Sequence, residues 1–192
     1  MEFEIIETAR LLLRKLTPET YDFVFRNYTE EELKTFFGCQ KEDDMVEERK
    51  KFEQGLSMYR KSLLVFQLID KTSGTVIGWC GYHTWYMLHY RAEVGYVLTD
   101  ETKRRQGLMK EALFAVIRYG FEQMGLKRIE ALTAPENAVS IRLLSDAGFV
   151  FEGKLREHYL VGESMEDSLI FSLLQREYDS KKSPDTEVVI TA

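Results

Sequence analysis

The chain has 192 residues, which suits one domain with a sizeable core and is short for two. Its hydrophobic fraction of 44% and its charged fraction of 30% are ordinary for a soluble globular protein. The formal net charge of −6 argues against general binding to nucleic acid or anionic membranes, because the field of the whole molecule would oppose it.

The first part of the chain predicts a short β-like run over residues 5–16. Pro18 fits the first turn of a following helix, with Thr17 as its N-cap. Residues 29–51 are highly charged, and we expect them to be helical in parts. Apolar residues at helical spacing then indicate a second buried stripe, at Phe52, Leu56 and Tyr59.

Strands dominate from residue 63 onwards. Residues 63–70 and 75–82 flank a turn and therefore indicate a hairpin, whereas the aromatic residues 85–91 are assigned to no element. Later strands are expected at 92–98, 128–133, 149–155 and 168–174, and helices at 108–119 and 138–147, closed by Gly125 and Gly148. Hairpins followed by strand–helix–strand units predict an α/β (α+β) fold with a mixed sheet. We expect one domain over residues 1–178 and a polar, loosely held tail at 179–192.

The sequence also bears on compartment and metals. The N-terminus lacks a secretory signal, and no apolar run approaches the ~20 residues of a membrane span. Cys39 and Cys80 form neither a C-x-x-C pair nor a zinc spacing, and the three histidines, His83, His89 and His158, show no ligand spacing. We therefore expect a cytoplasmic protein with reduced thiols, no metal, no membrane partner and no nucleic-acid partner.

The basic turn Arg104-Arg105-Gln106-Gly107-Leu108-Met109 is the most informative stretch. It lies between a predicted strand and a predicted helix, whose first turn leaves backbone N–H groups without partners. Those donors, the positive end of the helix dipole and the nearby cations suit a phosphate group. Neither a P-loop nor a dinucleotide-binding pattern is present. The turn predicts a site for a phosphate-bearing ligand; for these six residues alone, an ordinary polar loop is the alternative.

Four features then follow one another in fixed order: Glu93 on a strand, the basic turn, Asn137 with Ser140 after a later strand, and Gly148-Phe149 closing the next helix. Together with phrases such as Thr8-Ala9-Arg10-Leu11, they resemble the GNAT superfamily of N-acetyltransferases. The closest similarity is to the RimJ/RimL-like branch that acetylates ribosomal-protein N-termini. The resemblance spans about residues 5–178. It implies a single-domain GNAT fold whose central mixed sheet is flanked by helices, with splayed strands forming an acetyl-CoA cleft.

The resemblance implies acetyl-CoA as the acetyl donor. In this family, a turn of pattern [QR]-x-x-G-x-[GA] holds the diphosphate through backbone amides; Arg104 fills its first position and Gly107 its fourth, while Met109 stands where a glycine or alanine is usual. A backbone N–H of Val97 or Leu98 would face the thioester carbonyl and stabilise negative charge there. The implied cofactor-binding set is Val97, Leu98, Thr99, Arg104, Arg105, Gln106, Gly107, Leu108, Met109, Asn137 and Ser140.

Glu93 stands eleven residues before Arg104, the spacing of the general-base glutamate in histone-acetylating relatives. A substrate ammonium must lose a proton before its nitrogen can attack, and a carboxylate can accept it. The alternative is that Glu93 pairs with Arg91 or Arg105, or only binds the substrate cation. Less favoured carboxylates for the role are Glu152, Glu157 and Glu163.

The leaving thiolate can require a proton. The position at which many relatives carry a tyrosine is Leu144 here, whereas Ser140 resembles the serine that meets the sulfur in the ribosomal-protein branch; Tyr159 is a reserve acid. Ser140 could equally be a helix hydroxyl with local hydrogen bonds. Asn137 is expected either to contact the pantetheine arm or to cap the following helix, and the two roles are compatible.

The resemblance implies an N-acetyltransferase that transfers acetyl to a primary amine by direct attack in a ternary complex. The acceptor is a protein N-terminal amine or a small amine. The alternative is a non-catalytic acyl-CoA-binding regulator or sensor, which would keep the basic turn without the catalytic groups. The oligomeric state is left open, with a homodimer as one option.

Overall fold

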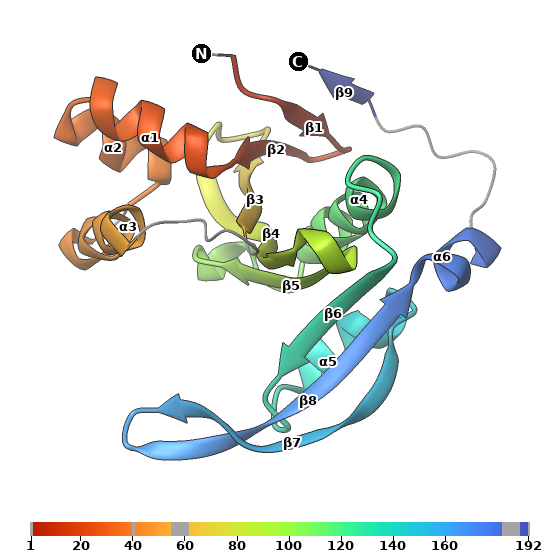
Figure 1. Cartoon of the computed structure of the whole chain (residues 1–192). Coiled ribbons are helices and arrows are strands. Elements are labelled where there is room, and N and C mark those ends of the chain that lie inside the picture. Colours follow the sequence, from red (N-terminus) through yellow and green to blue (C-terminus); the bar gives the residue numbers. More distant parts are fainter. Residues whose placement is uncertain (1, 40, 55–61, 182–188, 192) are drawn as a thin grey trace.

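The computed structural model of the chain describes residues 2–39, 41–54, 62–181 and 189–191. Its strands form one sheet in the order β7-β8-β6-β5-β4-β3-β2-β1-β9 (Figure 1). The strand bounds are β1 Ile5–Glu7, β2 Leu11–Leu16, β3 Ser62–Asp70, β4 Val76–Tyr86, β5 Arg91–Leu98, β6 Arg128–Thr133, β7 Val150–Val161, β8 Ser164–Leu174 and β9 Val189–Thr191. Neighbouring strands are antiparallel except β5 and β6, which are parallel, so the expected mixed sheet is confirmed.

The helices that the sequence predicts after Thr17, at Leu108 and at Ala138 begin at those residues. The helix bounds are α1 Pro18–Asn27, α2 Glu30–Phe37, α3 Glu42–Gln54, α4 Leu108–Glu122, α5 Ala138–Asp146 and α6 Gln175–Lys181, with short 3-10 turns η1 Met87–His89 and η2 Glu101–Lys103. Thr17 caps α1 as expected, because its side chain accepts the backbone N–H of Thr20. In the part of the chain that the structure describes, no helix is long and apolar enough to cross a membrane.

Two hydrophobic cores lie on opposite faces of the sheet. Phe66 of β3 belongs to the core that α4 covers, while its neighbour Val65 packs against the core formed with α1, α2 and α3. Successive strand residues point to opposite faces, which explains why β3 contributes to both cores. Both faces of the central strands are therefore buried.

Some elements differ from the sequence-based expectation. Residues 85–91 extend β4 to Tyr86 and then form η1. The last hairpin is longer than expected, because β7 and β8 have 12 and 11 residues, and α6 was not expected. In the tail, β9 pairs with β1 in register Ile6↔Ile190. α4 ends at Glu122, before Gly125. Leu56 and Tyr59 lie outside the described residues.

The parallel strands β5 and β6 diverge after a short common stretch. They pair only where Arg91–Glu93 lie beside Arg128–Glu130, although β5 continues to Leu98 and β6 to Thr133. Figure 1 shows the two strands separating, with α4 following β5 and α5 following β6. The expected splay is therefore present, and the chain continues from β5 towards α4 and from β6 towards α5.

Candidate active site

Two residues of the basic turn have left-handed backbone conformations, Arg105 with φ 61° and Gly107 with φ 75°. Gly107 is the N-cap of α4, and no side chain caps this helix. Left-handed residues direct successive N–H groups towards one side, which forms an anion-binding concavity. A positive φ is costly for a non-glycine residue such as Arg105, and this kind of strain concentrates at functional sites. The turn thus has the geometry expected of a phosphate site.

The turn is braced from a distant part of the chain. Arg10 donates from Nη1 to the carbonyl oxygen of Gln106 at 2.7 Å, and from Nε to Glu111 Oε2 at 2.8 Å. Glu111 also accepts hydrogen bonds from the Arg10 backbone and from Thr8 Oγ1. Although burial alone would raise it, these hydrogen bonds hold the pKa of Glu111 below its ordinary value. The sequence assigns no role to Thr8 or Arg10, which appear only in a stretch that resembles the GNAT superfamily.

The basic side chains in and beside the turn differ in whether they form an ion pair. Arg104 pairs with Glu101 at 2.9 Å, and Lys103 forms an ion pair with Asp70. The Gln106 amide donates to the carbonyl oxygen of Thr102 at 2.8 Å. Arg105 is exposed and has no side-chain partner among the described residues. It is therefore the cation of the turn that is available to an anionic ligand.

The end of β5 offers a backbone donor to the opening. Neighbouring residues of an antiparallel strand direct their N–H groups to opposite sides, so only one of Val97 and Leu98 can bond to β4. The other N–H points towards the gap that β6 leaves. Thr99 is not that donor, because its N–H bonds to the carbonyl oxygen of Ile77 at 3.0 Å.

At the start of α5, Asn137 acts as the N-cap: its Oδ1 accepts the backbone N–H of Ser140 at 3.0 Å. The capping alternative is thus the observed contact of Asn137. The Ser140 side chain interacts with the hydroxyl of Tyr96 on β5, and this opposes the rise that burial causes in the pKa of Tyr96. The sequence assigns no role to Tyr96, which lies in the stretch Ala92-Glu93-Val94-Gly95-Tyr96 that resembles the family.

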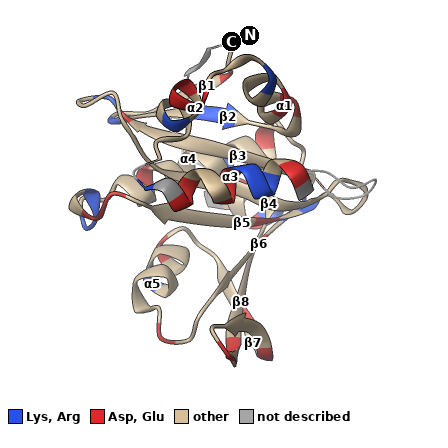
Figure 2. Ribbon diagram, turned by 90° about the vertical axis from the view of Figure 1, so that its left-hand side faces the viewer, with Lys and Arg blue, Asp and Glu red and all other residues tan. Residues whose placement is uncertain are grey.

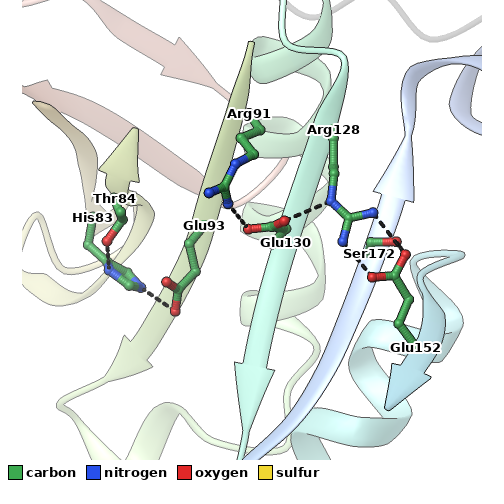
Figure 3. A network of polar contacts seen from close by, with 8 residues as sticks. All are labelled: His83, Thr84, Arg91, Glu93, Arg128, Glu130, Glu152 and Ser172. Carbon is green, nitrogen blue, oxygen red and sulfur yellow. Dashed lines mark hydrogen bonds and ion pairs between the residues drawn. The ribbon is translucent and has the colours of Figure 1, made fainter. Parts of the chain in front are cut away.

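Glu93 is largely shielded, with 16% of its side chain exposed, and its Oε1 lies 3.4 Å from Nε2 of His83 (Figure 3). It does not pair with Arg91, which instead binds Glu130 at 2.6 Å, nor with Arg105. Burial raises the pKa of Glu93, the nearby Glu130 adds to the rise, and His158 and Arg91 oppose it. A carboxyl with a raised pKa and no arginine partner is suited to accept a proton.

The other candidate carboxylates are less suitable. Glu152 is bound by Arg128 at 2.5 Å and by Ser172 Oγ at 2.6 Å, and these hydrogen bonds lower its pKa to about 2 (Figure 3). Glu157 and Glu163 are exposed on the β7–β8 hairpin. Tyr159, the reserve acid, is on the same hairpin and is 47% exposed. Among the carboxylates predicted from the sequence, Glu93 therefore has the environment that fits a base.

A cavity of about 870 Å³ lies on the face of the sheet covered by α1, α2 and α3, and reaches the end of β5 and Arg104. Trp79, His83 and Val97 are among its lining residues. Its acidic lining residues are Asp44, Glu47, Glu48, Asp100 and Glu101. α3 carries charges of both signs (Figure 2), and on it Glu47 pairs with Lys50 and Glu48 with Lys51. Within the described ranges, no cluster of three or more metal-ligating side chains occurs.

Comparison with known proteins agrees with this geometry. A family model described as an acetyltransferase (GNAT) domain matches residues 10–150. The chain is 30% identical over 181 residues to the uncharacterized N-acetyltransferase YoaA of Bacillus subtilis (strain 168), covering 90% of this chain and 98% of that protein. It is 34% identical over 177 residues to the uncharacterized N-acetyltransferase p20 of Bacillus licheniformis, covering 91% and 98%.

The fold is also shared with solved structures. The ribosomal-protein-S5-alanine acetyltransferase from Vibrio fischeri superposes with a TM-score of 0.62 at 20% identity, covering 89% of this chain and 96% of that one. The ribosomal-protein branch expected from the sequence is thus represented among proteins with this fold. The family match covers more than half of the chain and includes the basic turn. The chain therefore belongs to the acetyltransferase (GNAT) family, enzymes that take their acetyl group from acetyl-CoA.

Proposed function

We propose that this enzyme transfers acetyl from acetyl-CoA to a primary amine by direct attack in a ternary complex. The observation that carries the proposal is the uncapped start of α4, with Arg105 and Gly107 in left-handed conformations, beside the point where β5 and β6 diverge. An anion-binding turn next to an opening between strands suits a ligand with a diphosphate and a long arm.

The residues present fit this co-substrate. The backbone amides of residues 105–109 would hold the diphosphate, with Arg105 as the nearby cation. Met109 packs its side chain against the hydrophobic core, so its departure from the family pattern leaves the amides accessible. Asn137 and Ser140 border the opening from α5, where the pantetheine arm would lie. The acetyl group would then reach the free N–H of Val97 or Leu98.

The chemistry assigned to the site uses three groups. Glu93 accepts a proton from the substrate ammonium, because its raised pKa suits a base. The backbone N–H at the end of β5 stabilises the charge that develops on the carbonyl oxygen. Ser140, which interacts with Tyr96, supplies a proton to the departing thiolate. Glu93 and the backbone N–H both belong to β5, and Ser140 belongs to α5.

A covalent acetyl-enzyme is disfavoured at this site. Cys39 lines the cavity, but burial and the nearby Glu48 raise its pKa to about 11, and Cys80 is fully buried. A thiol with such a pKa is protonated at neutral pH and is a weak nucleophile. This supports direct attack by the amine.

The acceptor is proposed only by class. Among the described residues, the cavity lining has five acidic side chains against three basic ones, Lys41, Lys51 and Arg104, so its formal charge is negative. That balance favours a cationic acceptor, which describes both a protein N-terminal amine and a small amine. An acceptor screen that follows thiol release from acetyl-CoA would test both, with N-terminal peptides and small polyamines as the two arms. Tight acetyl-CoA binding without release for any acceptor would instead support a non-catalytic acyl-CoA binder.

The binding site is tested by Gly107→Asp, which places a carboxylate beside the diphosphate. We expect acetyl-CoA affinity, measured by calorimetry, to fall roughly tenfold or more, because charge at a helix N-terminus strongly affects anion binding. Gly125→Asp is the matched control: it has φ 65° and open space around it, at the other end of α4. Unchanged affinity in Gly107→Asp, or an equal loss in both variants, would contradict the site.

A further inference from the structure

We propose that His83 is a catalytic residue that takes the proton from the acceptor amine and passes it to Glu93. This inference rests on the proposed function and deepens it, since it names the group that meets the amine. It was not expected from the sequence, where the three histidines showed no ligand spacing and were assigned no role.

A β-bulge places His83 opposite Glu93. In the β4–β5 register, Tyr82 lies opposite Val94 and Thr84 opposite Glu93, so His83 is the extra residue between them. A bulge sets two residues of one strand against one of its partner and redirects a side chain, and bulges are common beside active sites. Both His83 and Thr84 therefore meet the face of β5 that carries Glu93 (Figure 3).

Gly95 gives the imidazole the space to lie across β5. A Cβ added at Gly95 would stand 2.6 Å from Cδ2 and 2.9 Å from Nε2 of His83, and 3.2 Å from Trp79 Cη2. Any larger residue at this position would push the ring away from Glu93. The absence of a side chain two residues after Glu93 on the same strand face thus permits the contact.

The imidazole stands between the cavity and the carboxylate. His83 lines the cavity and 38% of its side chain is exposed, whereas Glu93 is 16% exposed and is not among the described residues that line it. Val97, whose backbone is at the acyl end of β5, lines the same cavity. An amine that enters through the cavity towards Val97 therefore meets His83 before it meets Glu93.

Each ring nitrogen of His83 has a polar neighbour. Nε2 lies 3.4 Å from Glu93 Oε1, and Nδ1 lies 3.2 Å from Thr84 Oγ1. With its hydrogen on Nε2, the ring donates towards Glu93 and has its lone pair on Nδ1. Burial lowers the pKa of His83, so the ring is neutral and retains that lone pair at neutral pH. Burial and then Glu130 raise the pKa of Glu93, against the opposing charges of His158 and Arg91, so this carboxylate suits the role of proton acceptor.

The step balances as follows. The substrate ammonium takes the place of the Thr84 hydroxyl beside Nδ1 and gives one proton to that nitrogen, while Nε2 gives its own proton to the Glu93 carboxylate, so the imidazole stays neutral. The amine nitrogen attacks the thioester carbonyl carbon, the C–N bond forms and the C–S bond breaks. The second proton lost by the nitrogen ends on the departing sulfur. Glu93 afterwards releases its proton to solvent through the same ring.

The test compares His83→Ala, His83→Gln and His89→Ala, the last an exposed histidine on η1 away from the site. With an acceptor that the wild type acetylates, we expect both His83 variants to lose roughly 100-fold or more in kcat. Their acetyl-CoA affinity and Tm should stay near the wild-type values, and His89→Ala should keep wild-type activity. Added imidazole should restore part of the rate of His83→Ala, in proportion to its unprotonated fraction.

The outcomes separate this inference from the proposed function. Wild-type kcat in His83→Ala or His83→Gln would overturn the relay while leaving the acetyltransferase intact. A lost rate that imidazole does not restore would assign the ring a packing role and would equally overturn it. No thiol release by the wild type with any amine would count against the proposed function itself. His83→Gln keeps a polar side chain, so it remains informative if the alanine variant folds poorly.

Discussion

Glu93 has two properties that seldom occur together, a shielded carboxyl group and no arginine partner among the described residues. Burial first, and Glu130 second, raise its pKa. A base with a raised pKa is lost as pH falls through that pKa, so the enzyme's rate should decline on the acid side. At high pH, where the amine is already neutral, the base contributes little.

Glu93→Gln should therefore lower kcat/KM mainly at low and neutral pH, by roughly 100-fold. The acid limb that belongs to the Glu93 carboxyl should disappear, and the rate of the variant should instead rise with the fraction of unprotonated amine, approaching the wild-type rate only at high pH. The measurement is a pH profile of thiol release for both proteins with one acceptor. Wild-type activity of the variant across the whole pH range would exclude Glu93 as the base.

At the scale of elements, a chain of ion pairs joins β5, β6 and β7 where the parallel strands still pair. Glu130 accepts from Arg91 Nη1 at 2.6 Å and from Arg128 Nε at 2.7 Å, and Arg128 continues to Glu152 (Figure 3). Glu130 also contributes to the raised pKa of Glu93. A residue of β6, the strand beside β5, thus contributes to the pKa of Glu93.

Glu130→Gln should lower the pKa of Glu93, because it removes a negative charge and leaves Arg91 and Arg128 without their shared carboxylate. The acid limb of the pH–rate profile should then move to lower pH. Glu152→Gln is the control, since it also removes an ion pair of Arg128 but is not among the groups that shift Glu93. An acid limb that stays in place in an active Glu130→Gln enzyme would contradict this coupling.

The sequence predicted the elements whose signals are local. Strand 128–133, the Thr17 cap and the helix start at Leu108 are confirmed, because periodicity and capping chemistry are local properties of the sequence. The bulge at His83 was not predictable in this way, since it is a property of the register between two strands. The Tyr96–Ser140 and Arg10–Gln106 contacts join segments far apart in the chain and have no local signature.

At the scale of the whole molecule, α4 packs closely on the sheet where Tyr82 of β4 meets the helix. Tyr82 of β4 is fully buried, and its hydroxyl donates to the carbonyl oxygen of Val116 at 2.8 Å. Gly120, on the same helix, allows this approach: a Cβ there would stand 2.1 Å from the Tyr82 hydroxyl oxygen and 2.8 Å from Cζ. The glycine thus sets how closely α4, and with it the basic turn at its start, can sit on the sheet.

Gly120→Ala should consequently destabilise the protein, although alanine is the better helix former by about 1 kcal/mol. Overpacking a close-packed core typically costs about 1–3 kcal/mol, so a net loss of roughly 1 kcal/mol in the free energy of unfolding is expected. Tyr82→Phe alone should cost about 1 kcal/mol through its lost hydrogen bond. Because Phe also removes the clashing oxygen, the double variant should be more stable than the sum of the two single losses. Urea unfolding of the four proteins measures this coupling, and losses that add to within about 0.5 kcal/mol would show that α4 is not held at this point.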